Sequence, residues 1–194
     1  MPERSADGRF LRTVAALYVD VARGPYRHLP GVQLWGEAED ATQYRGPFPV
    51  VAHPPCGAWG AYAHKAHDTG ATGPVGVAQV RAFGGVLEHP AGSKLWAACG
   101  MPKPGQGVDR WGGYTVEVYQ RDWHHPADKK TWLYIVGCAP QDLPPLPPAQ
   151  PKAPFYRKAS GRTSTALERM AKSKRHLTPP MFASWLVEIA RRCR

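Results

Sequence analysis

The sequence predicts an α/β domain with a mostly parallel sheet, flanking helices and a C-terminal helix. Three apolar stretches bounded by Gly and Pro have the length and β-branched content of buried strands, at residues 14–19, 48–52 and 85–87. A helical segment at 74–83 separates the second stretch from the third, which is the order of a strand-helix-strand crossover. The 194 residues suffice for one such domain with its own core.

The remaining elements follow in chain order. In the helical segment, Val77, Val80 and Phe83 recur at the spacing of one helix face, so we expect them to face the sheet. Residues 114–119 and 131–136 are apolar or alternate, and a polar connection rich in histidine joins them. They are predicted to form a hairpin or two adjacent strands.

The C-terminal part begins with proline-rich residues 139–154, which favour an extended strap or linker rather than a helix. A convincing helix follows later, with Thr178 expected as its N-cap and Pro179 at its first helical position. Its apolar face consists of Phe182, Trp185, Leu186, Ile189 and Ala190. We therefore divide the chain into a catalytic-like domain at 1–138, a linker at 139–154, and a basic segment with the helix at 155–194.

The formal net charge of +10 favours a polyanionic partner, because each neutralised phosphate releases condensed counterions. Much of the charge is clustered after the proline-rich strap, which favours nucleic acid over the alternative of solubility alone. DNA is the expected partner, and RNA stays open. The candidate nucleic-acid-binding residues are Lys152, Arg157, Lys158, Arg162, Lys172, Lys174 and Arg175.

Several other classes are disfavoured. No apolar run approaches the roughly 18 residues that span a bilayer, and the first residues do not resemble a signal peptide, so we expect a cytoplasmic protein. The four cysteines form no C-x-x-C pair, which argues against a zinc knuckle or a disulfide framework and favours reduced thiols. Clustered histidines raise a metal hypothesis, but imidazoles that contact phosphates or bases are the preferred interpretation, and no metal is predicted.

Polar residues follow each predicted strand of the parallel sheet: Asp20 after the first, His53-Pro54-Pro55-Cys56 after the second, and Glu88-His89-Pro90 after the third. Open α/β sheets bind ligands beyond these carboxyl ends. Cys56 follows two prolines that restrict the backbone, as a nucleophile requires, although most single cysteines are small buried apolar residues. Glu88 is a candidate acid, with a surface carboxylate as the alternative.

Four motifs in order then suggest a family: Pro54-Pro55-Cys56, Leu87-Glu88-His89-Pro90, Tyr119-Gln120-Arg121 and Lys130-Thr131-Trp132-Leu133. They resemble the Pro-Cys, Glu-Asn-Pro and Gln plus Lys-Thr-Trp-Leu motifs of the cytosine-5 DNA methyltransferases, particularly of compact phage-type relatives. The resemblance covers residues 48–137, with His89 in place of the family's asparagine. It implies a reduced Rossmann-like methyltransferase core and, for a phage-encoded protein, the cytoplasm of a bacterial host.

The resemblance also implies a role for each matched residue. Cys56 would add to carbon 6 of a flipped-out cytosine, and Glu88 would hold or protonate ring N3 and contact the exocyclic amine. The base pocket would include Pro54, Pro55, His89, Pro90, Gln120, Arg121, Lys130 and Thr131.

In the family, S-adenosylmethionine donates the methyl group. Here the first predicted strand is soon followed by a second apolar segment at 32–35, and no helix fits between the two. The cofactor-binding half is therefore expected to be shortened, and the candidate residues for it are Asp20, Gly24, Trp35, Glu37 and Asp40.

Three functions remain open from the sequence. The leading hypothesis is a DNA methyltransferase acting at carbon 5 of cytosine. The second is an enzyme of phage DNA hypermodification that uses another donor. The third is a non-catalytic nucleic-acid-binding protein on a degenerate methyltransferase fold.

Overall fold

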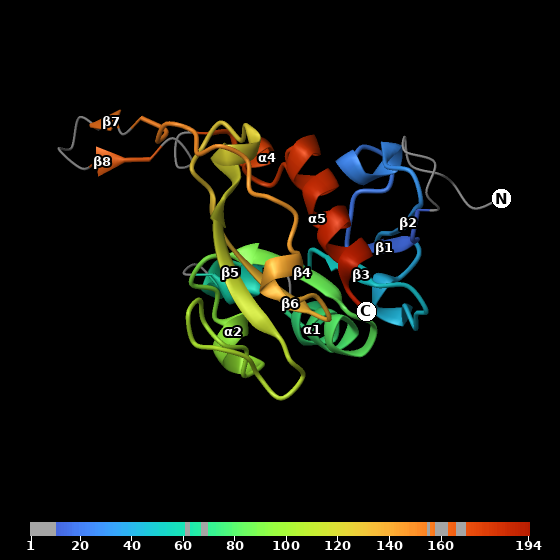
Figure 1. Ribbon diagram of the computed structural model, residues 1–194. Coiled ribbons are helices and arrows are strands. Elements are labelled where there is room, and N and C mark those ends of the chain that lie inside the picture. The colour runs from blue at the N-terminus through green and yellow to red at the C-terminus, as the bar shows by residue number, and fades with distance from the viewer. Residues whose placement is uncertain (1–10, 61–62, 67–69, 155, 158–162, 166–169) are drawn as a thin grey trace.

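A six-stranded mixed sheet forms the centre of the computed structural model (Figure 1), which describes the chain except for residues 1–10, 61–62, 67–69, 155, 158–162 and 166–169. The strand order is β2-β1-β3-β4-β6-β5. The first four run parallel, and β6 is antiparallel to both of its neighbours, so five strands share one direction. The strands are β1 (Val14–Leu17), β2 (Val32–Trp35), β3 (Val50–Ala52), β4 (Gly85–Pro90), β5 (Tyr114–Tyr119) and β6 (Lys130–Val136).

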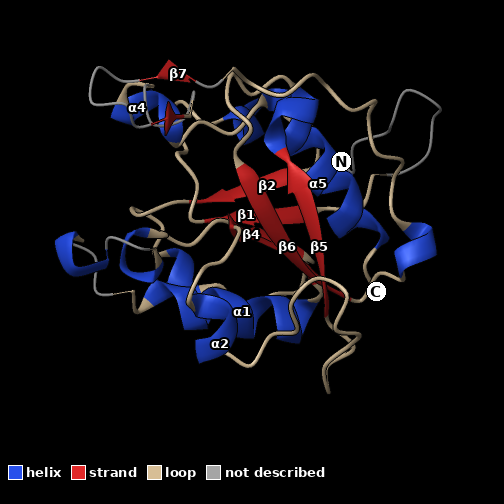
Figure 2. Ribbon diagram, turned by 90° about the vertical axis from the view of Figure 1, so that its left-hand side faces the viewer, coloured by secondary structure: helices blue, strands red, loops and turns tan. Residues whose placement is uncertain are grey.

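Helices cover both faces of the sheet, which confirms the α/β prediction. Figure 2 shows α1 (Thr72–Phe83) and α2 (Leu95–Ala98) on one face and α5 (Pro180–Arg192) on the other. Side chains alternate along each strand, so Ala15 and Leu17 belong to the core under α1, whereas Val14 and Ala16 belong to the core under α5. Both cores are closed to solvent.

Helix α1 occupies the predicted crossover between β3 and β4. Val77 and Val80 are buried against the sheet and Phe83 is partly buried beside them, as expected. The helix passes into β4 through Gly84 and Gly85, both at positive φ. A Cβ on Gly85 would lie 1.9 Å from the carbonyl oxygen of Val50, so only glycine lets β4 begin this close to β3.

Helix α5 carries the predicted apolar face into the core, where Phe182, Leu186 and Ile189 are fully buried. The predicted start of the helix is wrong by one residue. Pro179 takes the N-cap position with extended backbone, and no side chain caps the helix. Pro180, whose ring fixes a helical φ, begins the helix and disfavours helical backbone at the residue before it.

Strand ends differ slightly from the predicted ones. β4 continues to Pro90 because β6, rather than solvent, pairs with Glu88, His89 and Pro90. β1 ends at Leu17, since Tyr18 has a φ of 61° and leaves the strand conformation. The predicted pair of strands is confirmed as β5 and β6, with β6 inserted between β5 and β4.

No α-helix is described between β1 and β2, where the chain forms only the 3-10 helix η1 (Pro25–His28). The sheet face that such a helix would cover is instead covered by α5, which contacts η1, β1, β3 and β4. The last helix therefore belongs to the same core as residues before 138.

The proline-rich strap is held against this body at several points. The indole N–H of Trp185 lies 3.3 and 3.1 Å from the carbonyl oxygens of Pro144 and Pro145. Arg121 donates to the carbonyl of Gln150, and the Asp128 carboxylate accepts from the amide of Ala153. After the strap come β7 (Tyr156–Arg157), β8 (Thr163–Ser164) and the short α4 (Lys172–Arg175). Throughout the described ranges, no helix is long and apolar enough to cross a membrane.

Candidate functional site

The strand order places a switch point between β1 and β3. From β1 the chain moves outward to β2 on one side, and from β3 it continues to β4 on the other. In open α/β sheets, the carboxyl ends of the strands at such a point leave a crevice for ligands. Tyr18 and His53 are the first residues beyond the two strands, and the amide of His53 donates to the carbonyl of Leu17 across the gap.

A cavity of about 530 Å³ opens at this edge and receives both predicted catalytic residues. Cys56, half-buried, comes from the turn after β3, and Glu88, largely buried, comes from β4. The volume is within the usual range for small-molecule sites. Of the predicted base-pocket residues, Pro54, Pro55, His89, Pro90 and Lys130 line the cavity, and so do Tyr18, His53, Lys129, Arg175 and His176.

Glu88 is the centre of a hydrogen-bonded network. Its Oε2 lies 2.9 Å from Nδ1 of His53, and its Oε1 accepts from Nε2 of Gln120 at 2.9 Å. Burial alone would raise the pKa of this carboxyl group, but the hydrogen bond and charge of His53, assisted by the charge of Lys129, lower it to about 2. Glu88 is therefore a carboxylate at neutral pH.

Gln120 and Thr131 stand behind Glu88 rather than in the cavity wall. Gln120 is fully buried and also donates to Oγ1 of Thr131 at 3.0 Å. The hydroxyl of Thr131 donates in turn to the carbonyl of Lys129. The structure thus brings both predicted residues to the carboxylate, where they fix its orientation.

His89 packs beneath the Pro54-Pro55 turn. Its Nδ1 lies 2.8 Å from the hydroxyl of Ser93, and burial lowers the pKa of the imidazole although Glu88 and the carbonyls of Pro55 and Pro54 favour the charged form. The ring is 1% exposed. His89 therefore supports the turn that presents Cys56.

Lys129 is a cation that interacts electrostatically with the thiol of Cys56. Burial lowers the pKa of its ammonium group, while the charges of Glu88 and Cys56 raise it. Its Nζ also donates to the carbonyl of Leu177, which ties it to the segment before α5. Sequence reasoning had singled out its neighbour Lys130, whose ammonium instead pairs with Glu117 at 2.8 Å at the rim of the cavity.

Arg121 is placed differently from the other predicted pocket residues. Its guanidinium pairs with Asp128 at 2.8 Å and lies over the ring of Tyr119. With these contacts and its hydrogen bond to the carbonyl of Gln150, Arg121 holds the strap. It does not appear in the lining of the 530 Å³ cavity.

A second cavity, of about 460 Å³, adjoins the first across Tyr18 and Pro55, which line both. Glu37 and Asp40, predicted to bind the cofactor, lie in its wall with Gly36, Thr42 and Thr72. Both acidic residues are exposed. The loop after β2 therefore brings two carboxylates next to the cavity of Cys56.

The other three predicted cofactor residues have local roles. The carboxylate of Asp20 accepts from the amides of Ala22 and Arg23, which closes the turn after β1. Gly24 belongs to the same turn, where a Cβ would lie 2.3 Å from the carbonyl oxygen of Asp20. Trp35 packs edge-on against Tyr44, with ring centroids 5.3 Å apart.

Tyr18 is a residue that the sequence did not single out. Its φ of 61° is unusual for a bulky side chain and places it between the two cavities. Its hydroxyl donates to Gln79 at 2.8 Å, and burial followed by the charge of Asp40 raises its pKa to about 12. Its position directly after a strand is the same signal that identified Asp20.

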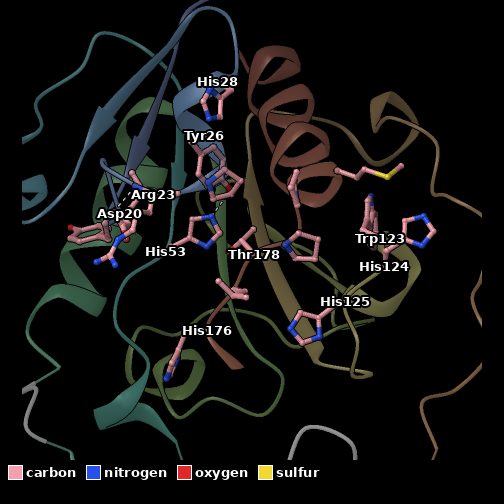
Figure 3. Close-up of a pocket in the computed structure, with 18 of the residues that line it drawn as sticks. Asp20, Arg23, Tyr26, His28, His53, Trp123, His124, His125, His176 and Thr178 are labelled. Atoms are coloured by element: carbon pink, nitrogen blue, oxygen red, sulfur yellow. Dashed lines mark hydrogen bonds and ion pairs between the residues drawn. The ribbon is translucent and has the colours of Figure 1, made fainter. Parts of the chain in front are cut away.

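A larger cavity, of about 970 Å³, shares Tyr18 and His53 with the cavity of Cys56 (Figure 3). Asp20 and Gly24 line it, together with histidines from four segments: His28, His53, His124, His125 and His176. Among the described residues, no three His, Cys, Asp or Glu side chains meet as a metal site.

The predicted nucleic-acid-binding residues are only partly described. Lys158 and Arg162 lie outside the described residues, and for Arg157 in β7 and Lys172 in α4 only the backbone is described. Lys152 and Lys174 are exposed, and Arg175 lines the cavity of Cys56 and Glu88.

The chain matches no model of a known protein family, no curated protein and no solved structure.

Proposed function

We propose that the protein modifies a pyrimidine base of a nucleic acid, most simply by transferring a methyl group to carbon 5 of cytosine in DNA. One observation carries the proposal: a thiol and a carboxylate, brought by the adjacent strands β3 and β4, line one cavity of suitable size. The order of the motifs around Cys56, Glu88, Gln120 and Lys130 supports the same family of reactions.

In this proposal, the sulfur of Cys56 bonds to carbon 6 of the pyrimidine and moves the electron pair of the C5–C6 double bond toward carbon 5. The Glu88 carboxylate accepts a hydrogen bond from the exocyclic amine, and a second one from N3 once thiolate addition has made the ring negative and N3 has taken up a proton from water. Once carbon 5 carries the methyl group, water takes its hydrogen as a proton, the C5–H electron pair re-forms the C5–C6 double bond, and the C6–S bond breaks with its electrons returning to the thiolate. N3 then releases its proton, which restores the ring. The charge of Lys129 supports the thiolate form of Cys56.

The second cavity suits S-adenosylmethionine. Glu37 and Asp40 offer acceptors for a ribose diol and for positive charge, and the cavity adjoins that of Cys56 across Tyr18 and Pro55. When bound, this cofactor would supply the methyl group. Asp20 and Gly24 would act indirectly, by shaping the turn after β1, and Trp35 by packing behind the wall.

The switch point and the strand order β2-β1-β3-β4 support a reduced Rossmann-like methyltransferase core, in which α5 replaces the helix absent after β1. We expect the partner to be DNA, and the same test carried out with RNA shows whether RNA is the substrate instead. Arg175 at the cavity and the net charge of +10 favour a polyanion.

The direct test is incubation with labelled S-adenosylmethionine and DNA that contains 5-fluorocytosine. Fluorine cannot leave carbon 5 as a proton, so we expect a trapped covalent adduct that Cys56→Ala abolishes. Cys99→Ala, at a second half-buried thiol outside this cavity, is the matched control and should keep the adduct. Absence of both methyl transfer and adduct, with DNA and with RNA, contradicts the proposal.

A second candidate keeps the pyrimidine and the nucleophile but uses another donor, as in hypermodified phage DNA. The observation that favours it is the short connection between β1 and β2, whose Asp20 and Gly24 are used within the turn. Calorimetric titration separates the two candidates. No heat with S-adenosylmethionine, together with a retained adduct at Cys56, would favour the other donor.

A further inference from the structure

A chain of partly buried hydrogen bonds runs from the wall of the 970 Å³ cavity to the carboxylate of Glu88. The hydroxyl of Tyr26 in η1 lies 2.6 Å from Nε2 of His53, and Nδ1 of His53 lies 2.9 Å from Oε2 of Glu88. Figure 3 shows Tyr26 and His53 side by side in the cavity wall. Gln120 completes the chain on the other carboxylate oxygen.

The ionised carboxylate at the end of this chain fixes the direction of its hydrogen bonds. An ionised carboxylate can only accept, so Nδ1 of His53 carries a proton and donates to Glu88 in both the neutral and the charged form of the ring. Burial, followed by the charge of Glu88, raises the pKa of Tyr26 well above 10, so its hydroxyl stays protonated; it donates to Nε2 of the neutral ring and accepts from Nε2 of the charged one. Gln120 can only donate through its amide nitrogen. Both oxygens of Glu88 therefore receive hydrogen bonds from the protein side.

We propose that His53, held between the hydroxyl of Tyr26 and the carboxylate, is the positioning residue for Glu88. It holds the carboxylate ionised and in one orientation, so that Glu88 meets a ligand as a hydrogen-bond acceptor. The site should then bind a pyrimidine whose exocyclic amine can donate a hydrogen bond to Glu88. A pyrimidine with a carbonyl oxygen at the same ring position should bind less well, because two acceptors would face each other. This inference rests on the proposed function and deepens it.

The other charged groups that face Glu88 do not replace His53. Lys129 and His89 lower the pKa of the carboxyl group less than His53 does. His125, which follows the 3-10 helix η5 (Gln120–Trp123), has its own pKa lowered by burial and raised by the charge of Glu88. None of the three makes a described hydrogen bond to the carboxylate. Without the imidazole, burial is the largest influence left on the Glu88 pKa.

Two substitutions of His53 separate the contact that Nδ1 makes with Glu88 from the contact that Nε2 makes with Tyr26. His53→Asn keeps an amide donor near the position of Nδ1, whereas His53→Gln reaches toward Tyr26 and leaves Oε2 without its donor. Tyr26→Phe removes only the hydroxyl. Tyr44→Phe is the matched control, because it removes another buried hydroxyl, which donates to the carbonyl of Phe48 away from Glu88.

Two readouts are taken from pH 3 to pH 8: the rate of adduct formation on 5-fluorocytosine DNA, and the titration of Glu88 by carboxyl carbon NMR. The Glu88 pKa of the unaltered protein is about 2, so no Glu88 midpoint should fall within this range. In His53→Gln we expect the midpoint and the acid limit of the rate to rise by about one pH unit or more, into the measured range, because the hydrogen bond and charge of the imidazole no longer oppose the effect of burial. His53→Asn and Tyr26→Phe should lie between His53→Gln and the unaltered protein. Tyr44→Phe should follow the unaltered protein.

The two readouts keep the inference and the proposed function distinguishable. If the unaltered protein forms no adduct at any pH, the proposed function fails, and the NMR titration still decides whether His53 positions Glu88. A Glu88 carboxyl group that shows no midpoint above pH 3 in His53→Gln overturns the inference, whether or not adduct forms. An adduct on DNA with 5-fluorouracil in place of 5-fluorocytosine, formed at the same rate, overturns the preference for an amine.

Discussion

The carboxylate of Glu88 links the candidate site to the stability of the fold. Its pKa of about 2 lies below the ordinary value of 4.5, so the folded state holds it ionised more strongly than the unfolded chain does. At 1.36 kcal/mol per unit, this difference contributes about 3 kcal/mol above pH 4.5. The contribution is lost as the pH falls from 4.5 through 2, and about 2 kcal/mol of it disappears by pH 3.

Glu88→Gln removes the ionisable group and therefore this pH dependence. We expect the unaltered protein to be more stable than the variant at pH 7, and the gap to narrow by about 2 kcal/mol at pH 3. Urea denaturation of both proteins across this range measures the gap. The same substitution at the exposed Glu37 is the control for loss of one charge. A gap that stays constant from pH 7 to pH 3 refutes the reasoning.

Three further predictions concern the packing and the charge. Phe182→Ala empties a fully buried position between α5 and the sheet and should lower the unfolding free energy by about 3–5 kcal/mol, measured by urea denaturation. Trp185→Phe removes the indole hydrogen bonds to Pro144 and Pro145 and should cost about 1 kcal/mol in the same assay, with protease cleavage in the strap as a second readout. Lys174→Ala should reduce by about 1 the slope of log affinity for DNA against log salt, while Lys103→Ala, exposed in the loop that leads to β5, should not.

The sequence predicted the parts of this fold that repeat a simple pattern. Local periodicity predicted the buried strands β1, β3 and β4, the crossover helix α1 and the apolar face of α5. The structure confirms each of these elements. The convergence of Cys56 and Glu88 followed from one rule, that the carboxyl ends of neighbouring parallel strands meet at one edge. That rule does not require knowledge of any side-chain contact.

The supporting residues could not be predicted in the same way. Tyr26 reaches His53 only because α5 and η1 pack on the same face of the sheet, a contact between positions far apart in the chain. Lys129 was passed over for Lys130 because Lys130 begins the Lys-Thr-Trp-Leu motif of the resemblance. Lys129 comes just before β6 with a φ of 34°, and no local sequence pattern predicts this backbone conformation. The start of α5 was misplaced because two consecutive prolines override the capping preference of Thr178.

The position of α5 in the central core has a consequence for the basic residues before it. Lys174 and Arg175 lie between two fastened parts of the chain: the strap before them, and after them the helix α5, which packs on one face of the sheet. Lys174 and Arg175 are thus tethered at both ends near the mouth of the cavity, and their effective concentration there is set by the fold. Cutting the chain after the strap would remove this charge and the helix together, so a shortened protein without the basic segment would lose its core as well.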